Sequence, residues 1–341
     1  MKKISVIIPC YNVGAYIERC FASLEGQTIG IDQLELIFID DGSTDDTYDK
    51  LLKIEKSYEE HVIVLHSDVN IKPGAARNLG LEYASADYVL FVDSDDWVDD
   101  NYCQLLYERA ESEQLDMVIC NVLRDFGNGK VIEVSKRARV REVASLEDEA
   151  IRKQFLVEDR LGDYCYAKLI RRQVLVDNDI YFPEGIVFED IAWGKLCYGY
   201  FRQIGFEPDT YYHYFVNESS IVLKKGQDYY EDMLISNEYK WESIVNRNLL
   251  EDMRLEWEFD FLVTYFLGVI KMFTLHYDHI PLEVFERMQA YIAAHISSIS
   301  DNKYVKEYLS KGQQDLLFFA DKTIKEDELK QLYKIIKSIG V

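Results

Sequence analysis

An apolar run at residues 88–92 (Tyr-Val-Leu-Phe-Val) ends abruptly in the acidic segment Asp93-Ser94-Asp95-Asp96. Such a run predicts a buried strand, and open α/β sheets bind their ligands at the carboxyl ends of strands. Carboxylate oxygens are the ligands that Mg²⁺ and Mn²⁺ prefer, and a bound cation can in turn hold a phosphate. The alternative is an acidic surface turn, because Asp is a common turn residue.

Polar side chains also follow two earlier strands, at 9–12 (Pro-Cys-Tyr-Asn) and 40–45 (Asp-Asp-Gly-Ser-Thr-Asp). Asp41 can accept a hydrogen bond from a base imide and Tyr11 can stack on the base, a combination that suits a pyrimidine nucleotide. The alternative is a set of strand-to-helix caps. In particular, Ser43 with Asp46 three residues later predicts a capping box that opens the second helix.

The loop at 72–80 (Lys-Pro-Gly-Ala-Ala-Arg-Asn-Leu-Gly) is small and basic. Gly74 allows close approach at a helix start, while Lys72 and Arg77 offer cations for a diphosphate. A tight turn would explain Pro73-Gly74 but not Arg77-Asn78.

These segments lie in an alternating pattern that predicts an α/β fold with a doubly wound, mainly parallel sheet. The predicted strands are 4–8, 34–39, 62–65, 88–92 and 117–120, and the predicted helices are 15–24, 44–58, 75–84 and 102–113. The pattern weakens from 124 to 160, where Gly127-Asn128-Gly129 predicts a hairpin turn. Beyond about 225 the chain reads as helical. We therefore expect a catalytic domain at 1–223 and a helical carboxyl-terminal domain at 224–341.

The formal net charge of −23 disfavours nucleic acid as a partner and broad docking on anionic lipid. A diphosphate would need a metal or a local Arg/Lys pair to reverse the sign. The six scattered cysteines predict buried free thiols. With no signal peptide, and with the apolar stretch 261–273 too short to span a bilayer, we expect a cytoplasmic protein with at most peripheral membrane association. Lysine-bearing segments at 303–311 and 330–337 predict solvated helix faces.

Four segments occur in a telling order: Ser-Val-Ile-Ile-Pro-Cys-Tyr-Asn (5–12), Ile-Asp-Asp-Gly-Ser-Thr-Asp (39–45), Gly-Ala-Ala-Arg-Asn-Leu-Gly (74–80) and Phe-Val-Asp-Ser-Asp-Asp (91–96). Lys168-Leu169 and the stretch 182–190, ending in Glu189-Asp190, follow. Residues 4–222 thereby resemble the inverting, nucleotide-sugar-dependent glycosyltransferases of family two, which have the GT-A fold.

The resemblance implies a metal-dependent transfer of a hexose or hexosamine from a UDP-sugar to a hydroxyl of a glycan or lipid-linked oligosaccharide, in cell-surface polysaccharide assembly. Asp190 would be the general base, with Glu189 supporting it or meeting the acceptor. Asp95 and Asp93 would hold Mg²⁺ or Mn²⁺. The residues implied in donor binding are Pro9, Tyr11, Asn12, Asp41, Lys72, Arg77, Asn78, Asp93 and Ser94.

One segment departs from the family pattern, because relatives often carry arginine where this chain has Phe215, Val216 and Asn217. Lys224 or Lys225 could substitute, and His213 is either a further metal ligand or a packed, hydrogen-bonded residue. The missing arginines leave open an inactive partner subunit that binds a nucleotide-sugar. A sugar-phosphate nucleotidyltransferase is a second alternative, although the loop after the first strand is not Gly-rich and basic. The helical domain could dock an acceptor, a second protomer or a membrane surface.

Overall fold

The structure is a computed structural model that describes residues 2–135, 137–217 and 229–339. The chain divides into two compact units. The first comprises Met1–Arg152 and Arg160–Ser220, and the second comprises Lys153–Asp159 and Ile221–Val341. The main division thus falls three residues before the expected boundary at 223/224, and a short helical stretch near residue 155 groups with the second unit.

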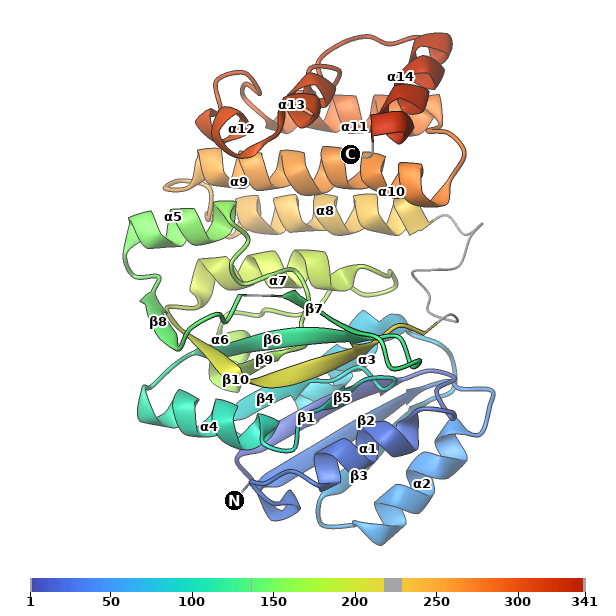
Figure 1. The fold of residues 1–341 in the computed structure, drawn as a ribbon, viewed down its shortest axis with the longest axis vertical. Coiled ribbons are helices and arrows are strands. Elements are labelled where there is room, and N and C mark those ends of the chain that lie inside the picture. The colour runs from blue at the N-terminus through green and yellow to red at the C-terminus, as the bar shows by residue number, and fades with distance from the viewer. Residues whose placement is uncertain (1, 136, 218–228, 340–341) are drawn as a thin grey trace. The chain divides into compact units, whose positions relative to one another are not determined.

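Ten strands in the described part of the first unit form one sheet with the main order β3-β2-β1-β4-β9-β6-β10-β5 (Figure 1). In addition, β7 pairs with β6 and β8 pairs with β10. The strands are β1 Ile4–Cys10, β2 Leu34–Asp41, β3 Val62–Ser67, β4 Tyr88–Phe91, β5 Trp97–Val98, β6 Met117–Asp125, β7 Val131–Ser135, β8 Glu142–Ser145, β9 Lys168–Arg171 and β10 Gln203–Phe215.

Strand direction decides where the polar strand ends meet. Strands β3, β2, β1 and β4 run parallel to one another, and β6 and β10 are parallel to each other. Because β9 is antiparallel to both β4 and β6, it leaves those two strands pointing the same way. The carboxyl ends of β1, β2, β4, β6 and β10 therefore lie on one edge, as expected for the mainly parallel sheet.

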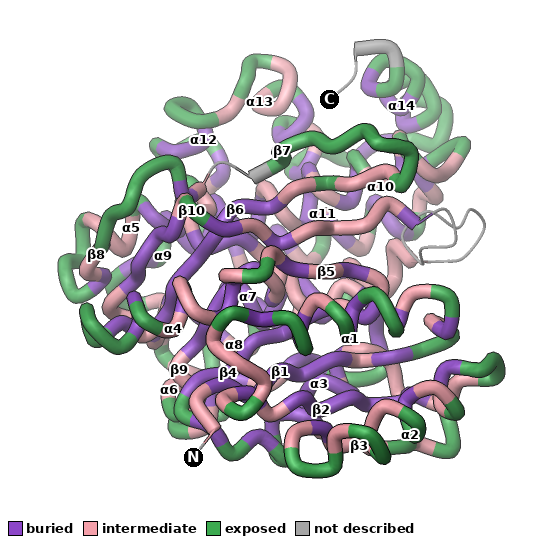
Figure 2. Tube along the Cα trace, turned by 60° about the horizontal axis from the view of Figure 1, so that its bottom comes forward, coloured by how far each residue is buried: buried purple, intermediate pink, exposed green. Residues whose placement is uncertain are grey.

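Both faces of the sheet are covered, which explains the continuous apolar runs in its strands. Ile4, Val6 and Ile8 of β1 are buried in a cluster with residues of α1 (Ile17–Glu25) and α4 (Tyr102–Ser112). Ile7 points the other way, toward α3 (Lys72–Tyr83), where a Cβ on Gly80 would lie 2.4 Å from its Cγ2 atom. Figure 2 shows the resulting burial along β1, β2 and β4.

The remaining helices of this unit are α2 Thr47–Ser57, α6 Arg172–Asp177, α7 Glu189–Tyr200 and the short 3₁₀ helix Ile31–Gln33, while α5 Glu149–Val157 bridges the unit boundary. The predicted capping box is wrong. Helix α2 begins at Thr47 rather than near residue 44, and no side chain caps it at Asp46. The Ser43 hydroxyl instead accepts a hydrogen bond from the Asn12 N–H at 3.0 Å, so it ties two loops together. The hairpin turn at 127–129 is confirmed, because β6 and β7 pair across it.

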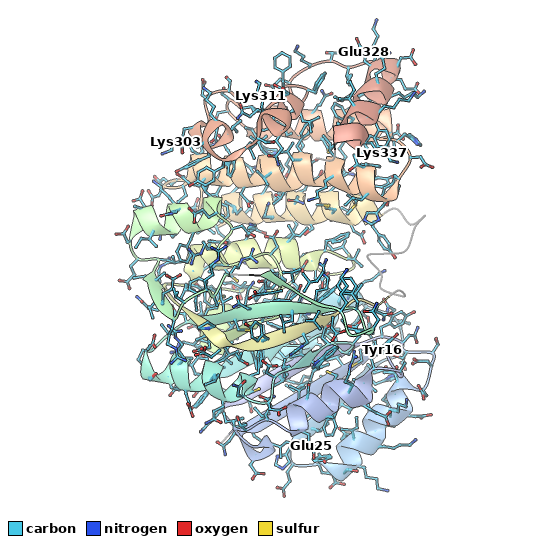
Figure 3. The ribbon with its side chains drawn as sticks, viewed as in Figure 1. Tyr16, Glu25, Lys303, Lys311, Glu328 and Lys337 are labelled. Atoms are coloured by element: carbon cyan, nitrogen blue, oxygen red, sulfur yellow. The ribbon has the colours of Figure 1, made fainter. Side chains whose placement is uncertain are left out.

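The described residues of the second unit are helical, as predicted: α8 Tyr229–Asn246, α9 Arg254–Phe261, a π-helical segment Leu262–Leu267, α10 Gly268–His276, α11 Leu282–His295, α12 Lys303–Tyr308, α13 Lys311–Leu317 and α14 Glu326–Ile339. Lys303, Lys311 and Lys337 on the last three helices are exposed, which confirms the solvated faces (Figure 3).

The apolar stretch at 261–273 belongs to a longer helix than expected. Arg254–His276 is continuous over 23 residues and contains an apolar window of 18 residues with a mean hydropathy of 1.3, so length and composition alone would let it cross a membrane. A buried core helix meets the same two criteria, and 61% of the apolar window is buried. The six cysteines are free and buried, as predicted.

Candidate active site

The acidic loop after β4 is fixed by β10. The Tyr212 hydroxyl donates a hydrogen bond to Asp96 Oδ2 at 2.6 Å and accepts one from the Asp93 N–H at 3.0 Å. The Phe215 N–H donates to Asp96 Oδ1 at 2.7 Å. Asp96 is buried and both of its oxygens are used, so it anchors the loop. Asp93 and Asp95 are therefore the acids of this loop that could bind a ligand.

Arg77 connects the acidic loop to the start of α7. Its Nη2 donates to Asp93 Oδ1 at 2.7 Å, and its Nη1 donates to Glu189 Oε1. Arg77 and Glu189 are separated by 112 residues in sequence and are 6% and 4% exposed. Ion pairs this deeply buried persist only with good geometry and several partners. Arg77 thus holds the two predicted acidic segments in one site.

A glycine permits this approach of α3 to the segment before α7. A Cβ on Gly74 would lie 2.4 Å from the Pro183 carbonyl oxygen and 3.2 Å from Glu189 Cγ. Phe188 adopts a left-handed conformation (φ 63°) immediately before α7, which turns the chain into the helix. The close approach expected of Gly74 is therefore confirmed, and its partner is another part of the chain.

Asp190 lies beside Glu189 in the first turn of α7. Burial raises the pKa of Asp190 to about 8, and the neighbouring charges of Glu189 and Asp163 add to the rise. Burial also raises the pKa of Glu189, but the guanidinium of Arg77 opposes that rise. Because Glu189 has the cation as its direct partner, we assign the charge of this pair to Glu189 and the proton to Asp190 at neutral pH.

Asp95 is the second acid with a perturbed pKa. Burial raises the pKa of Asp95 to about 6, and the adjacent charge of Asp93 contributes. A cation beside the carboxylates of Asp93 and Asp95 would favour the ionised form of Asp95 and so oppose the rise in its pKa. Within the described residues, no three His, Cys, Asp or Glu side chains are placed to hold a metal. A cation held by Asp93 and Asp95 would need further ligands, such as substrate phosphates, as is usual for Mg²⁺.

His213 is engaged elsewhere. Its Nε2 lies 2.7 Å from Asp99 Oδ1, and its ring stacks on Trp97 with centroids 5.2 Å apart. This geometry does not support the prediction that His213 is a metal ligand, because its Nε2 is paired with Asp99 and not with Asp93 or Asp95. The packed, hydrogen-bonded alternative describes it.

The predicted nucleotide-base residues lie at the ends of β1 and β2. Pro9 is half-buried within β1 opposite Ile39, and Tyr11 is 43% exposed just after the strand. Asp41 is buried and accepts a hydrogen bond from the Ile71 N–H at 2.5 Å. Burial raises the pKa of Asp41, although this backbone contact opposes the rise. An exposed ring and a carboxylate thus flank one edge of the sheet.

Two further donor-binding candidates have structural partners. The Asn12 Oδ1 accepts from the Thr44 N–H at 2.8 Å, so Asn12 ties the β1 loop to the β2 loop. The Ser94 side chain is buried and contacts the thiol of Cys10. Asn12 and Ser94 thus hold the loops around the site in place, and neither brings a charge to it.

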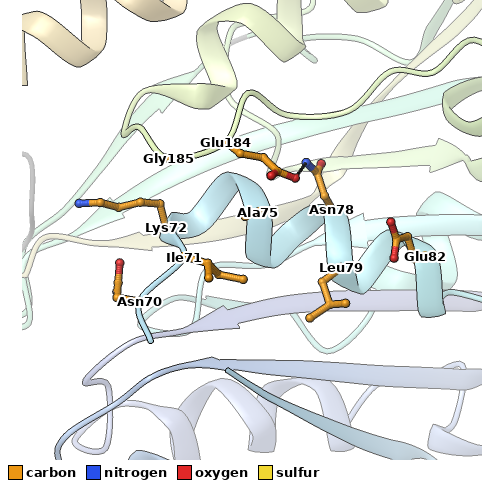
Figure 4. A pocket seen from close by; sticks show the side chains of 9 residues that line it. All are labelled: Asn70, Ile71, Lys72, Ala75, Asn78, Leu79, Glu82, Glu184 and Gly185. Atoms are coloured by element: carbon orange, nitrogen blue, oxygen red, sulfur yellow. Dashed lines mark hydrogen bonds between the residues drawn. The ribbon is translucent and has the colours of Figure 1, made fainter. Parts of the chain in front are cut away.

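Asn78 and Lys72 lie along a pocket of about 670 Å³ (Figure 4). Asn78 Nδ2 donates to the Phe182 carbonyl at 2.9 Å and to Glu184 Oε1 at 3.0 Å, and its Oδ1 accepts from the Phe182 N–H. Its amide is thus fully used, which leaves the expected donor contact without support. Lys72 begins α3 with φ +73°, a strained value for a side-chain-bearing residue. The pocket is lined by Asn70, Ile71, Lys72, Ala75, Asn78, Leu79, Glu82, Glu184 and Gly185.

The segment where relatives carry arginine lies against the acidic loop. Asn217 Nδ2 donates to Asp95 Oδ2 at 3.5 Å, a long contact. Sequence reasoning missed Arg19 of α1, whose guanidinium carbon lies 4.0 Å from the Trp97 ring centroid and 4.4 Å from that of Phe215. Its Nη2 donates to the Asp95 carbonyl at 2.6 Å, so a cation does adjoin the loop. No sequence motif marks a surface arginine within a helix. Lys224 and Lys225 lie outside the described residues.

Comparisons with known proteins identify the family and the fold of this chain. Residues 5–178 match the model of the family described as "Glycosyl transferase family 2". The uncharacterized glycosyltransferase YibD of Escherichia coli is 33% identical over 223 residues, which cover 64% of this chain and 63% of YibD. The poly(ribitol-phosphate) beta-glucosyltransferase of Bacillus spizizenii is 33% identical over 216 residues, which cover 63% of this chain and 32% of that enzyme. The chain therefore matches less than two thirds of the length of each of these two relatives.

Among solved structures, residues 1–349 of Staphylococcus aureus TarS in complex with UDP-GlcNAc superpose with a TM-score of 0.73. The match covers 98% of this chain and 90% of that one at 24% sequence identity. At this identity the likeness establishes the fold, which is GT-A with a helical carboxyl-terminal region.

Proposed function

Because the chain belongs to glycosyl transferase family 2 and is a glycosyltransferase, we propose that it transfers a hexose or hexosamine from a UDP-sugar to a hydroxyl of a glycan acceptor with inversion. One observation carries the proposal. Arg77 pairs with Asp93 on one side and Glu189 on the other, so the donor-side acids and the base-bearing helix share one site.

The donor half of the proposal rests on the edge formed by β1 and β2. Tyr11 is exposed there and can stack on a base. Asp41 is buried and already accepts a hydrogen bond from the Ile71 N–H, and because a carboxylate accepts several hydrogen bonds, an imide N–H would be a further donor to it. TarS, whose structure contains UDP-GlcNAc, supports a uridine nucleotide as the carrier. The glucosyl and N-acetylglucosaminyl transferases among the relatives support a hexose or hexosamine as the sugar.

The acceptor half rests on Asp190. An acceptor hydroxyl becomes a better nucleophile as its proton moves to a carboxylate, and Asp190, in the first turn of α7, can be that carboxylate in its ionised form. The charge of Asp93 is among those that raise the pKa of Asp190, so the base is near the donor-side acids. The acceptor oxygen forms a bond to the anomeric carbon while the bond from that carbon to the diphosphate oxygen breaks on the opposite face. The diphosphate leaves without a proton, so one base suffices, in contrast to the two carboxyl groups of glycosidases.

The remaining charge problem concerns the leaving diphosphate. Asp93 and Asp95 would hold Mg²⁺ or Mn²⁺, and the cation, when bound, would neutralise charge on the diphosphate. A relative of the same fold, a mannosyltransferase from Pyrobaculum calidifontis, has a structure with GDP-Man and Mn²⁺. Arg77 orients Asp93 for this task, and Arg19 adds positive charge next to Asp95.

The cellular setting is inferred from the relatives. Two of them act on poly(ribitol-phosphate) by name, which supports a role in cell-surface polysaccharide or glycoconjugate synthesis. A lipid-linked oligosaccharide acceptor would bring the protein to the inner face of the cell membrane from the cytoplasm. The helical unit would then serve acceptor docking or a homo-oligomer contact.

Release of UDP from UDP-glucose and UDP-GlcNAc with Mn²⁺ tests the proposal. We expect Asp95→Asn and Asp190→Asn to lower turnover by about 100-fold or more. Asp100→Asn is the matched control, because Asp100 is an exposed acid five residues from Asp95 and beyond strand β5, and it should retain activity within about twofold. Donor binding without turnover on a broad acceptor panel would instead indicate a partner subunit. Consumption of UTP with a sugar 1-phosphate would indicate a nucleotidyltransferase.

A further inference from the structure

The loop at 161–167 adjoins the proposed base. Besides burial and Glu189, the carboxylate of Asp163 raises the pKa of Asp190, which requires the two side chains to be near each other. A Cβ on Gly194 of α7 would lie 2.5 Å from the Asp163 carbonyl oxygen, so the loop packs directly on the helix that bears the base. The loop therefore lies next to the position that an acceptor hydroxyl would take at Asp190.

A row of stacked tyrosines runs from this loop to the acidic loop. The rings of Tyr164 and Tyr166 are stacked with centroids 4.6 Å apart, and those of Tyr166 and Tyr212 with centroids 4.7 Å apart. Tyr212 in turn donates its hydroxyl hydrogen to Asp96. The row thus fixes the position of Tyr164 relative to the acids after β4.

A buried lysine makes the outer end of the row rigid. Lys168 is 1% exposed, and its Nζ donates to the carbonyl oxygens of Gly162, at 2.9 Å, and Tyr164. A buried ammonium is stable only when its donors are satisfied, so these carbonyls must stay in place. This gives Lys168, which the sequence singled out only by resemblance, a positioning role.

Two arginines lie on the tyrosines at this end of the site. The Arg137 Nη1 donates to the Tyr164 hydroxyl at 3.0 Å, and a Cβ on Gly162 would lie 2.9 Å from its guanidinium carbon. Arg124 is exposed at the end of β6 and lies 5.6 Å from the ring centroid of Tyr214. Tyr214 itself lies 6.0 Å from Tyr166 in the row. Arg124 and Arg137 therefore both contact tyrosines that are connected, through Tyr166 and Tyr212, to the acidic loop.

We propose that Arg124 and Arg137 each bind a phosphate group of the acceptor, one or more residues away from the hydroxyl that is glycosylated. The inference rests on the proposed function and adds the chemical class of the acceptor to it. A protein with a net charge of −23 repels a phosphate-bearing chain unless local cations receive it. A guanidinium matches a phosphate with two parallel, charge-assisted hydrogen bonds, whereas a neutral glycan offers no negative charge to pair with it.

Arg77 does not serve this purpose, because its guanidinium is committed to Asp93 and Glu189 inside the site. The phosphate could belong to a polyol-phosphate polymer or to a lipid-linked diphosphate. The relative from Bacillus spizizenii, named for poly(ribitol-phosphate), supports the first source.

Direct binding to three probes tests the proposal without requiring turnover. The probes are fluorescently labelled poly(ribitol phosphate), a short-chain lipid-linked disaccharide diphosphate, and labelled dextran as a neutral glycan. The full chain should bind at least one phosphate-bearing probe, and more tightly than dextran. Arg124→Gln and Arg137→Gln should each weaken that binding about tenfold, since a charged hydrogen bond is lost. The preferred phosphate probe identifies the source.

Arg139→Gln is the matched control, because it removes the same charge from an exposed position two residues from Arg137. It should change binding by no more than about twofold, in line with exposed charges. The proposal is overturned if the wild-type chain binds neither phosphate probe, if both variants bind as the wild type does, or if all three variants weaken binding equally. UDP release from the donor without acceptor, measured in parallel, reports on the proposed function separately and should be unchanged in the arginine variants.

Discussion

The ionisation of Asp190 should set the pH dependence of the reaction, and the charge of Glu189 should set the pH at which Asp190 ionises. Burial raises the pKa of Asp190 to about 8 in the donor-free protein, with Glu189 as the next contributor. A base must be ionised to work, so kcat/KM for the donor should rise with pH through a midpoint near pH 8 and level off about one pH unit above it. At pH 7 only about one molecule in ten would carry the ionised base.

Replacing Glu189 with Gln removes the nearest negative charge and keeps the side-chain size. A unit charge within about 8 Å at an effective dielectric constant of about 20 contributes about 2 kcal/mol, which corresponds to about 1.5 pH units. Arg77 would also lose one of its two carboxylate partners, and its charge would then favour the ionised form of Asp190 more strongly. Both effects have the same sign, so the midpoint of the profile should move down by about one to two pH units.

The assay is UDP release at constant ionic strength from pH 5.5 to 9.5, with the profile normalised to its plateau. At pH 6.5 the normalised rate of Glu189→Gln should exceed that of the wild type by about tenfold, whatever the plateau height. A midpoint that stays in place or moves upward would show that Glu189 does not hold the proton on its neighbour.

The same carboxyl should be visible in stability, without any turnover. The pKa of Asp190 in the folded protein is about 8, above the 3.8 of the free group, so the folded state binds the proton more tightly. The stability that this provides is complete below about pH 4 and is lost as pH rises toward 8. Asp190→Asn does not titrate, so its Tm should gain on the wild type by several degrees between pH 5 and 8 and then by no more. A constant Tm difference across this range would contradict the raised pKa.

Two further substitutions probe how the site is held. Tyr212→Phe leaves the buried carboxylate of Asp96 one donor short, and should cost about 1–3 kcal/mol of stability and raise the KM for the donor. Tyr214→Phe is its control, and an equal loss in both variants, read from Tm, would refute the special role of the Tyr212 hydroxyl. Gly74→Ala places a Cβ 2.4 Å from the Pro183 carbonyl oxygen, so it should destabilise the protein by about 1–3 kcal/mol and lower kcat by separating α3 from α7. Unchanged Tm and kcat in Gly74→Ala would mean that the two elements need not approach so closely.

The first 125 residues were the most legible part of the sequence. All five predicted strands are confirmed. Four of the predicted apolar runs, in β1, β2, β4 and β6, are almost entirely buried, whereas β3 stands at the end of the strand order and is mostly half-buried. The secondary structure of the middle of the chain could not be predicted from the sequence. Strands β7 and β8 and helix α5 lie at 124–160, where polar and charged residues mask the pattern. Strand β8 lies along β10 with two exposed residues, so it carries little apolar signal.

The site, too, was predictable in part. The types of residues that could do chemistry, and the edge of the sheet where they meet, followed from strand ends and parallel order. The partners of those residues did not: Asn78 proved to hold the Phe182 backbone, and His213 proved to pair with Asp99. A side chain with several donors satisfies whichever acceptor the packing brings near, and sequence spacing says nothing about that choice.

Sequence by itself determined that carboxylates from several strands gather at one edge of a mostly parallel sheet, because strand direction and period are local properties of the chain. Tertiary structure alone decided which carboxylate carries a proton, which one anchors a loop and which one pairs with Arg77. Those outcomes depend on burial and on contacts between residues more than a hundred positions apart, such as Arg77 with Glu189 and Tyr212 with Asp96. A charge in a protein is governed by its surroundings in space, and the surroundings exist only once the chain has folded.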